Sequence, residues 1–498
     1  MPELPLSCLL DGLHATYRGC DPGLVVRGVA VDSRAVRPGN AFLALVGQNH
    51  DGHRFLDEAM RRQACVAIVR RDRVPNTDEP LVIVEDTTLA CARIAANLYG
   101  WPARQLRLAG VTGTNGKTTT AHLVSAMLTA ARRHHGRLGT TGDWLVDHVA
   151  ASTLTTPFPM DLQARFADVL TRGGSEVVME VSSHALAQGR IDALSYACVG
   201  LTNLTQDHLD FHVTMEAYFS AKLLLAARYL RHDGVAVALI DDAPHGDRFL
   251  AAAREHGATA WSASTSSAAD IQARLVHMGD HGMSAHVDTP AGSFAFESPL
   301  VGSFNLDNVL VAIAMALALD VPQDAMIAAL REFRGAPGRL ERVSTSGVAG
   351  PLVLVDYAHT PDAVRRVLAA VRASCRGTLH VVLGCGGDRD PAKRPHMGSA
   401  AAHGADRFYA TSDNPRSEAP ERIIDMMLAG VPPELSSKVI RECDRREAIR
   451  LAIHSANEHD VVVIAGKGHE DYQLVGNQRL ELDDRREAEA ALRARAAR

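Results

Sequence analysis

A glycine-rich loop that contains one lysine, residues 110–120 (GVTGTNGKTTT, the phosphate loop), carries the clearest chemistry in the sequence. It follows an apolar run that predicts a strand and precedes a segment with helical periodicity. A loop in this position aims main-chain N–H groups and a helix N-terminus at phosphate oxygens. Lys117 would reach the outer phosphates, and Thr118 could bind Mg²⁺. Because Val111 stands where the P-loop pattern has glycine, we expect a variant P-loop that binds ATP or GTP; the alternative is a glycine-rich turn with a chance lysine.

Acidic and histidine side chains follow two further apolar runs. Glu180 lies near the end of the predicted strand 176–181, where a carboxylate is costly to bury unless a metal or a cation receives it. We expect a Mg²⁺ role there, with a surface turn as the alternative. The next run leads into four potential ligands, Asp207, His208, Asp210 and His212. No cysteine is near, and a phosphate loop favours Mg²⁺ over zinc. From spacing alone His208 is either a ligand or a structural histidine, and Lys222, in the amphipathic segment 218–230, is expected to be a surface lysine.

An arginine, Arg416, lies where a predicted strand runs into a turn at residues 410–420 (ATSDNPRSEAP). The turn formers before it are Asp413, Asn414 and Pro415. Most exposed arginines are only solvated surface, which is the simpler interpretation. The carboxyl ends of strands in open α/β sheets bind ligands, however, so Arg416 is also a candidate ligand contact.

Strands that alternate with helices predict an α/β protein with several domains. At about 100–200 residues per domain, 498 residues allow two to four. Short apolar runs in the first hundred residues indicate a small α/β unit, and the strands that follow predict a parallel sheet covered on both faces. A second strand–loop–helix pattern starts near residue 351. Chain breakers at 99–108 and 331–342 predict three domains, near 1–100, 101–335 and 336–498.

The composition excludes several classes of protein. A net charge of −6 gives no basic footprint, so no nucleic-acid partner is expected. No apolar run reaches about 18 residues, and the N-terminal stretch lacks the pattern of a secretory signal, so no membrane span or export is expected. The eight cysteines are scattered without a C-x-x-C pair, which argues against a zinc site and a disulfide framework. Reduced thiols in the cytoplasm are expected.

A series of motifs spread over nearly the whole chain resembles the Mur ligase family. In order they are DSRAVRPGNAFLALVGQNHDGHRF, TGTNGKT, MEVSSH, DHLDFH, GSFNLDNVLVA, PGRLER, DYAHTPDA, GCGGDRDPAKRP, DNPR and GKGHEDYQ. The resemblance implies three α/β domains. These are a small N-terminal UDP-sugar domain, a central P-loop-type parallel-sheet ATPase domain and a C-terminal Rossmann-like domain.

The resemblance also implies an activity, that of an ATP-dependent amide ligase of peptidoglycan precursor synthesis. Its substrates would be UDP-N-acetylmuramoyl-L-alanyl-D-glutamate, meso-diaminopimelate and ATP, with Mg²⁺ as cofactor, and we expect a cytoplasmic monomer. A substrate carboxylate attacks the γ-phosphate of ATP to give an acyl phosphate, from which the incoming amine expels phosphate. Positioning and charge neutralisation do most of this work. Two alternatives stay open: an L-lysine-adding form and a non-catalytic nucleotide-binding relative.

Matching the family's motifs to this sequence gives each candidate residue an implied role. Catalytic roles fall on Lys117, Glu180, His208 and Lys222. Mg²⁺ ligands would be Thr118, Glu180, His208 and a carbamate formed on Lys222 (N6-carboxylysine). ATP would contact Gly113, Thr114, Asn115, Gly116, Lys117, Thr118, Thr119, Asn305, Arg339 and Asp356. The UDP-linked dipeptide would contact Ser33, Gln48, Asn49, His50, Thr155, Thr156, Ser182, Gln188 and Arg190. The diamino acid would contact Arg389, Asp413, Asn414, Pro415, Arg416, Gly466 and Glu470.

The DNPR loop, residues 413–416, is the family's diaminopimelate signature. Meso-diaminopimelate carries a second carboxylate at its far end, whereas lysine ends in a bare amine. A guanidinium binds a carboxylate with two parallel hydrogen bonds and would repel an ammonium group. Arg416 therefore favours diaminopimelate as the incoming amino acid, with Glu470 or Asp413 receiving its amino groups.

Overall fold

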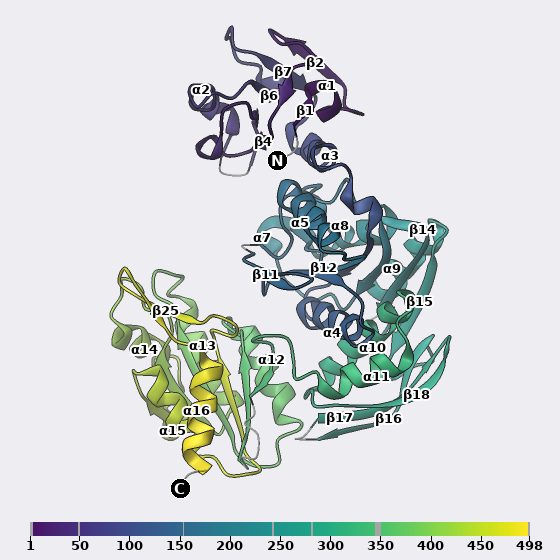
Figure 1. Cartoon of the computed structure of the whole chain (residues 1–498). Coiled ribbons are helices and arrows are strands. Elements are labelled where there is room, and N and C mark those ends of the chain that lie inside the picture. The colour runs from purple at the N-terminus through teal and green to yellow at the C-terminus, as the bar shows by residue number, and fades with distance from the viewer. Residues whose placement is uncertain are drawn as a thin grey trace. The chain divides into compact units, whose positions relative to one another are not determined.

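The computed structural model describes residues 3–47, 50–152, 154–241, 244–279, 282–343 and 350–496 (Figure 1). Its contacts divide the chain into two compact units. The first comprises Met1–Lys117, Ala131–Ala263 and Ala314–Val321. The second comprises Thr118–Ala130, Ser264–Ile313 and Pro322–Arg498. Strands alternate with helices in both units, so the predicted α/β class is confirmed.

The N-terminal part of the first unit is a five-stranded sheet. The order across it is β2 (Ala15–Arg18), β7 (Leu81–Val84), β6 (Val66–Arg70), β5 (Ala41–Leu43) and β4 (Val29–Ala30). β2 is antiparallel to β7, and the other neighbours are parallel. The long helix α3 (Thr87–Tyr99) begins at Asp86, whose carboxylate accepts two main-chain N–H groups of the first turn. The shorter elements are β1 (Leu4–Pro5), α1 (Leu6–Leu9), β3 (Val25–Val26), η1 (Ser33–Ala35), η2 (Gly52–Phe55), α2 (Leu56–Arg61), η3 (Arg71–Arg73) and η4 (Pro102–Gln105).

The larger sheet of the first unit is parallel in its centre. The order is β11 (His148–Ala150), β10 (Asp143–Leu145), β9 (His135–Leu138), β12 (Glu176–Glu180), β8 (Arg107–Thr112), β13 (Tyr196–Leu201), β14 (Leu230–Leu239) and β15 (Thr259–Ser264). Near one edge of this part of the sheet, β10 runs opposite to the others and pairs antiparallel with both β9 and β11. Val111 of β8 pairs with Glu180 on one side and with Gly200 on the other, so the ends of three strands align. The helices here are α5 (Pro159–Thr171), α6 (Ser183–Ala187), α7 (Leu209–His212), α8 (Met215–Ala227) and α9 (His245–Glu255).

The second unit begins with a helix and an antiparallel meander. Helix α4 (Lys117–Ala130) starts at the phosphate-loop lysine, and the apolar face predicted for it is buried. The meander and the helices after it are β16 (Ile271–Gly279), β17 (Gly282–Thr289), β18 (Gly292–Ser298), α10 (Ser303–Ala318) and α11 (Gln323–Glu332).

The C-terminal sheet is parallel except for one edge strand. The order is β19 (Glu341–Val343), β20 (Leu352–Asp356), β24 (Val461–Ala465), β21 (Leu379–Cys385), β22 (Arg407–Ser412) and β23 (Val439–Arg441), with β19 antiparallel. A hairpin, β25 (Tyr472–Val475) and β26 (Gln478–Glu481), follows β24. The helices are α12 (Pro361–Arg372), α13 (Lys393–Gly404), α14 (Pro420–Leu428), α15 (Arg445–Ser455) and α16 (Asp484–Ala496), and η5 (Pro433–Lys438) precedes β23.

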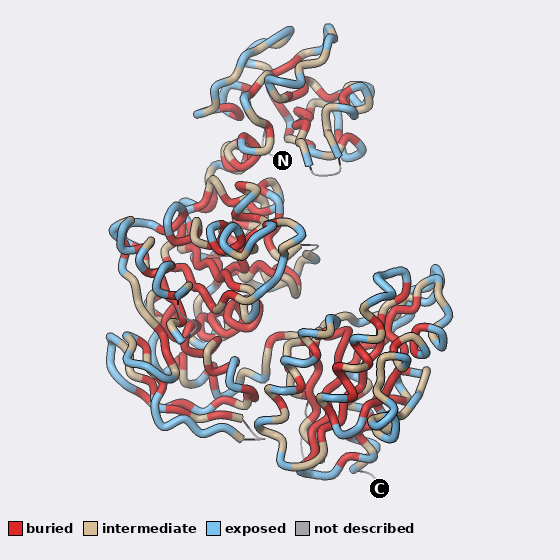
Figure 2. The backbone as a smooth tube through the Cα atoms, turned by 180° about the vertical axis from the view of Figure 1, so that it is seen from behind, coloured by how far each residue is buried: buried red, intermediate tan, exposed pale blue. Residues whose placement is uncertain are grey.

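Helices bury both faces of the C-terminal sheet. Val381 packs in a core with α12, α13 and α14, whereas its neighbour Val382 packs in a separate core with α15 and α16. This alternation explains why the central strands β21 and β24 are buried along their whole length, as the red tube in Figure 2 shows. Among the described helices, none is both long enough and apolar enough to cross a membrane.

Candidate active site

The phosphate loop is tied to the segment that follows β13. The Thr114 N–H donates to the Asn203 carbonyl, and the Asn115 N–H donates to Asn203 Oδ1, both at 3.0 Å. Thr114 Oγ1 donates to the Thr205 carbonyl and accepts from the Thr205 N–H, also at 3.0 Å. These reciprocal bonds give the loop a defined shape at the carboxyl ends of β8 and β13.

Two lysines converge on this loop. Lys117 Nζ donates to the carbonyls of Gly113 and Thr114, each at 2.8 Å, and Lys222 Nζ of α8 donates to the same Gly113 carbonyl at 2.8 Å. Lys222 is only 1% exposed, so the pattern-based expectation of a surface lysine is wrong. Burial and the nearby Lys117 ammonium hold the pKa of Lys222 well below its ordinary value. A lowered pKa favours the neutral, nucleophilic amine.

Glu180 is buried at the end of β12. Its carboxylate accepts hydrogen bonds from the Thr140 N–H at 2.8 Å and from the Thr140 hydroxyl at 3.2 Å. Arg137 is close enough to interact with it electrostatically, although burial still lowers the pKa of Arg137 to about 10. Donors and a cation compensate this buried charge, and a carboxylate in such a site is a suitable Mg²⁺ ligand.

We expect the substitution Gly139→Ala to reduce turnover by about tenfold or more, since small displacements of reacting groups are costly. A Cβ at this position would lie 2.2 Å from Glu180 Oε1, so the carboxylate would have to move. The control is Gly279→Ala, where a Cβ would meet no atom of the described residues within 4 Å. Steady-state rates and melting temperatures of both variants check the prediction. A Gly139→Ala enzyme with normal turnover would show that the position of Glu180 is not critical.

His208 lies directly before α7 among aromatic rings. Its ring centroid is 4.8 Å from that of His184 and 6.0 Å from that of Tyr218. Burial is the largest cause of a lowered pKa at His208, and it favours the neutral imidazole that can bind a metal. Within the residues that the structure describes, no three His, Cys, Asp or Glu side chains form a metal-binding group by themselves.

Residues predicted to hold the UDP-linked dipeptide gather beside β12. Thr156 Oγ1 donates to the last carbonyl of β12 at 2.9 Å and accepts the Ser182 N–H at 3.0 Å. Arg190 donates to Gln188 Oε1 through Nε at 2.9 Å and Nη2 at 2.7 Å, and to the Thr156 carbonyl at 3.0 Å. Thr155 Oγ1 lies 3.1 Å from the Thr140 hydroxyl, which also contacts the Glu180 carboxylate. The structure thus joins the five central residues of this predicted set.

The other members of the same set, residues 33 and 48–50, belong to the N-terminal part of the chain. Ser33 is buried in η1, and its hydroxyl donates to Glu58 Oε2 at 2.9 Å. His50 is exposed. Gln48 and Asn49 lie outside the described residues. The substrate contacts of all four stay predictions.

Three residues outside the phosphate loop that are predicted to contact ATP belong to the second unit. Asp356 ends β20, where its carboxylate accepts the N–H groups of Leu340 and Ala358, each at 2.8 Å. Arg339 interacts electrostatically with Asp356. Asn305 is buried in α10, and its amide donates to the Val301 carbonyl at 2.8 Å. In the structure, the side chains of Asp356 and Asn305 therefore hydrogen-bond to main-chain groups, and their contacts with the nucleotide stay predictions.

Arg416 has a left-handed backbone conformation, with φ of 52°. Its N–H donates to the Leu474 carbonyl at 2.9 Å, and its carbonyl accepts the Gly476 N–H at 2.7 Å. Nη1 donates to the Gly387 carbonyl at 2.7 Å. Nε and Nη2 donate no hydrogen bond to any residue that the structure describes. Two adjacent N–H groups thus remain to bind a carboxylate.

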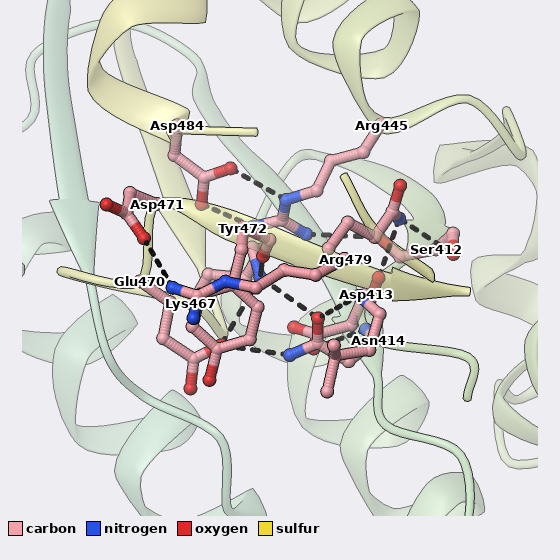
Figure 3. Close-up of polar contacts among 12 residues, drawn as sticks. Ser412, Asp413, Asn414, Arg445, Lys467, Glu470, Asp471, Tyr472, Arg479 and Asp484 are labelled. Atoms are coloured by element: carbon pink, nitrogen blue, oxygen red, sulfur yellow. Dashed lines mark hydrogen bonds and ion pairs between the residues drawn. The ribbon is translucent and has the colours of Figure 1, made fainter. Parts of the chain in front are cut away.

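Three of the other predicted amino-acid contacts, Asp413, Asn414 and Glu470, lie close together just after β22 and β24 (Figure 3). Asp413 and Asn414 are buried, and Asn414 Nδ2 donates to Glu470 Oε2 at 2.9 Å. A Cβ at Gly466 would come within 2.9 Å of Asp413 Oδ2, so glycine permits this approach. Pro415 is also buried, and the remaining predicted contact, Arg389, is exposed.

Comparisons with known proteins agree with this geometry. The family models described as "Mur ligase family, catalytic domain", "Mur ligase middle domain" and "Mur ligase, glutamate ligase domain" match residues 25–99, 111–316 and 338–468. A relative from Thermosynechococcus vestitus is 45% identical over 94% of both chains, and one from Gloeobacter violaceus is 45% identical over 100% of both. The chain belongs to the Mur ligase family. Both relatives bear the name UDP-N-acetylmuramoyl-L-alanyl-D-glutamate–2,6-diaminopimelate ligase. A solved structure with the same name is 33% identical to this Mur ligase, with a TM-score of 0.69 over 94% of this chain and 95% of that one.

The sequence did not single out several residues that shape the sites of this Mur ligase. The Tyr218 hydroxyl forms a hydrogen bond of 3.1 Å with Thr114 Oγ1, and its ring centroid lies 4.4 Å from Lys222 Nζ. Lys467 and Gln473 contact the DNPR loop, and both belong to the motif GKGHEDYQ. Their position in a motif of the family could have indicated a role for Lys467 and Gln473. Nothing in the sequence pattern indicated a role for Tyr218, because its contacts depend on the packing of α8.

Proposed function

We propose that this Mur ligase joins meso-diaminopimelate to UDP-N-acetylmuramoyl-L-alanyl-D-glutamate at the expense of ATP. The observation that carries the proposal is the pair of donors on Arg416, beside the Asn414–Glu470 contact. They match the far carboxylate of diaminopimelate, which L-lysine lacks. The names of the two 45% identical relatives support the same choice. The L-lysine-adding alternative would place an ammonium against this guanidinium.

The proposed reaction has two steps. The D-glutamate carboxylate attacks the γ-phosphorus of ATP, and the bond to ADP breaks to leave an acyl phosphate. The amine of diaminopimelate then attacks the acyl carbon, loses a proton, and expels inorganic phosphate from a tetrahedral intermediate. Lys117 is suited to the phosphates because it already contacts the loop carbonyls, and Arg190 with Thr156 is suited to the dipeptide. Positioning of these groups supplies most of the acceleration.

We assign Mg²⁺ binding to Thr118, Glu180, His208 and Lys222 as its carbamate. The buried, compensated carboxylate of Glu180 and the low pKa of His208 fit this assignment. Mg²⁺ in such sites is held by one or two protein groups together with nucleotide phosphates and water, so these four residues would serve more than one Mg²⁺ ion. When bound, Mg²⁺ would neutralise charge on the transferring phosphoryl group.

Carbamate formation on Lys222 fits its surroundings. The neutral amine attacks CO₂, a C–N bond forms as one C–O π bond opens, and one proton is released, so that an uncharged side chain becomes an anionic oxygen ligand. The lowered pKa of Lys222 favours the amine that this step requires. An anion would also be attracted to the Lys117 ammonium, whereas an unmodified Lys222 ammonium is repelled by it.

The decisive assay measures phosphate release from ATP by the purified enzyme. We expect release only when the UDP-linked dipeptide and diaminopimelate are both present, and much less when L-lysine replaces diaminopimelate. Equal rates with L-lysine would contradict the assigned substrate. A rate of phosphate release that does not depend on either substrate would instead indicate a nucleotide-binding relative without ligase activity.

We also propose domain boundaries near residues 100 and 335, and a monomer that acts in the cytoplasm. The eight cysteines are free thiols, as in proteins from a reducing compartment. Size-exclusion chromatography with light scattering checks the monomer.

A further inference from the structure

Lys467 is a fully buried lysine between β24 and β25, with a side chain that is 0% exposed. Nζ donates to Asn414 Oδ1 at 3.4 Å, to Glu470 Oε2 at 3.3 Å, and to the Tyr472 carbonyl (Figure 3). Three donors therefore meet three acceptors, and the ammonium has no unused hydrogen-bonding group. A buried charge is expensive, so its complete pairing indicates a defined geometry around it.

This ammonium determines which way the Asn414 amide points. Oδ1 accepts from Lys467 and from the Leu474 N–H, the latter at 2.9 Å, while Nδ2 donates to Glu470 Oε2 at 2.9 Å. Turning the amide over would place its NH₂ group against two other donors. Lys467, together with the Leu474 N–H and Glu470, therefore holds Asn414 in one orientation.

The same contacts hold Glu470 by one of its two oxygens. Oε2 accepts from Asn414 and Lys467, whereas Oε1 accepts no hydrogen bond from any residue in the described part of the chain. The Glu470 side chain is 21% exposed, so it is within reach of a ligand. One oxygen is fixed, and the other remains available to a cationic group.

A second buried cation fixes the strands that carry these residues. Arg445 donates to the carbonyl of Ser412 at 3.4 Å and to that of Ala465 at 2.9 Å, and it pairs with buried Asp484 at 2.6 Å. Ser412 directly precedes the DNPR loop, and Ala465 lies two residues before Lys467. Arg445 therefore fixes the ends of β22 and β24, the two strands that lead to Asn414 and Lys467.

We propose that Lys467 is a positioning residue for the incoming diamino acid: it holds Asn414 and Glu470 so that Glu470 Oε1 receives the ammonium group of the substrate. Lys467 itself does not touch the substrate. The inference rests on the proposed function, because it takes this pocket as the diamino-acid site. It assigns recognition of the amino group to Glu470 and recognition of the carboxylate to Arg416.

The test compares Lys467→Met with Lys438→Met. Methionine keeps an unbranched apolar stem but removes the ammonium. Lys438 is the matched control, because its Nζ donates to the carbonyls of Ala402 at 3.3 Å and Ala405 at 3.0 Å, away from the DNPR loop. We expect Lys467→Met to raise the KM for diaminopimelate by about tenfold or more, as for a lost charged hydrogen bond. The KM for ATP should change by less than about twofold in both variants, because their ATP-binding residues are unaltered.

A double-mutant cycle shows whether Lys467 acts through Glu470. Residues that act together give non-additive effects, so Lys467→Met should raise the KM for diaminopimelate far less in a Glu470→Gln background. Additive effects, or an unchanged KM in Lys467→Met, would overturn the inference. If Lys467→Met melts well below the wild type, Lys467→Gln, which keeps an amide donor, is judged by the same criteria. A wild-type enzyme that ignores diaminopimelate would overturn the proposed function as well, so the two failures are distinguishable.

Discussion

Turnover by the Lys222→Ala enzyme is expected to fall by about 10²–10³-fold, the typical cost of removing one charge-stabilising group from an active site. The side chain is 1% exposed, and its Nζ lies 2.8 Å from the Gly113 carbonyl of the phosphate loop. Alanine removes the amine on which a carbamate would form. Phosphate release at saturating substrates measures the loss.

Two controls separate the carbamate from a structural role. If a carbamate is the active form, formate or acetate added to Lys222→Ala should partly restore turnover by supplying the missing carboxylate, and the intact wild-type protein should carry the mass of one CO₂. If Lys222 only holds the loop through its hydrogen bond, small carboxylates will have no effect. Lys438→Ala, a lysine that contacts main-chain carbonyls in the C-terminal sheet region, should keep normal turnover.

Local spacing was enough to predict the phosphate loop, the strand that precedes it and helix α4. The reason is that a strand, a glycine-rich turn and a helix N-terminus are specified by adjacent residues. Glu180 was found in the same way, from its place at the end of an apolar run. The register that sets Glu180 beside Val111 then follows from parallel pairing of β8 and β12.

Burial of single polar side chains could not be read from the same patterns. Lys222 lies 109 residues from the carbonyl that it contacts, and Lys467 lies 53 residues from Asn414. Lysines are usually exposed, and only long-range packing makes exceptions of Lys222, in helix α8, and of Lys467, between β24 and β25. Family resemblance corrected the expectation for Lys222, but it gave no role to Lys467.

The DNPR loop shows the same limit in its backbone. The sequence predicted a turn at Asp413, Asn414 and Pro415. The left-handed conformation of Arg416 depends on main-chain bonds to Leu474 and Gly476, which come from a hairpin that follows a different strand. Non-glycine residues adopt such a conformation only when their surroundings impose it, and here the hairpin does so.

Replacing Arg416 by alanine is expected to raise the KM for diaminopimelate by about 100-fold, since two charged hydrogen bonds are lost at roughly 1.5 kcal/mol each. The donors concerned are Nε and Nη2, because Nη1 is already bonded to the Gly387 carbonyl. Arg416→Lys should be nearly as impaired, because an ammonium group cannot form two parallel bonds to a carboxylate. Initial rates at varied diaminopimelate and fixed ATP measure the effect.

The KM for ATP decides whether Arg416 acts in substrate choice. We expect it to stay near the wild-type value in both Arg416 variants, and the exposed Arg422→Ala, on α14, to behave as the wild type. A parallel rise in both KM values would mean that the substitution disturbs the whole enzyme. A guanidinium at this place repels the ammonium of L-lysine. Arg416→Ala should therefore also lower the ratio of the rate with diaminopimelate to the rate with L-lysine. A ratio that does not change would assign the choice of amino acid to other residues of the pocket.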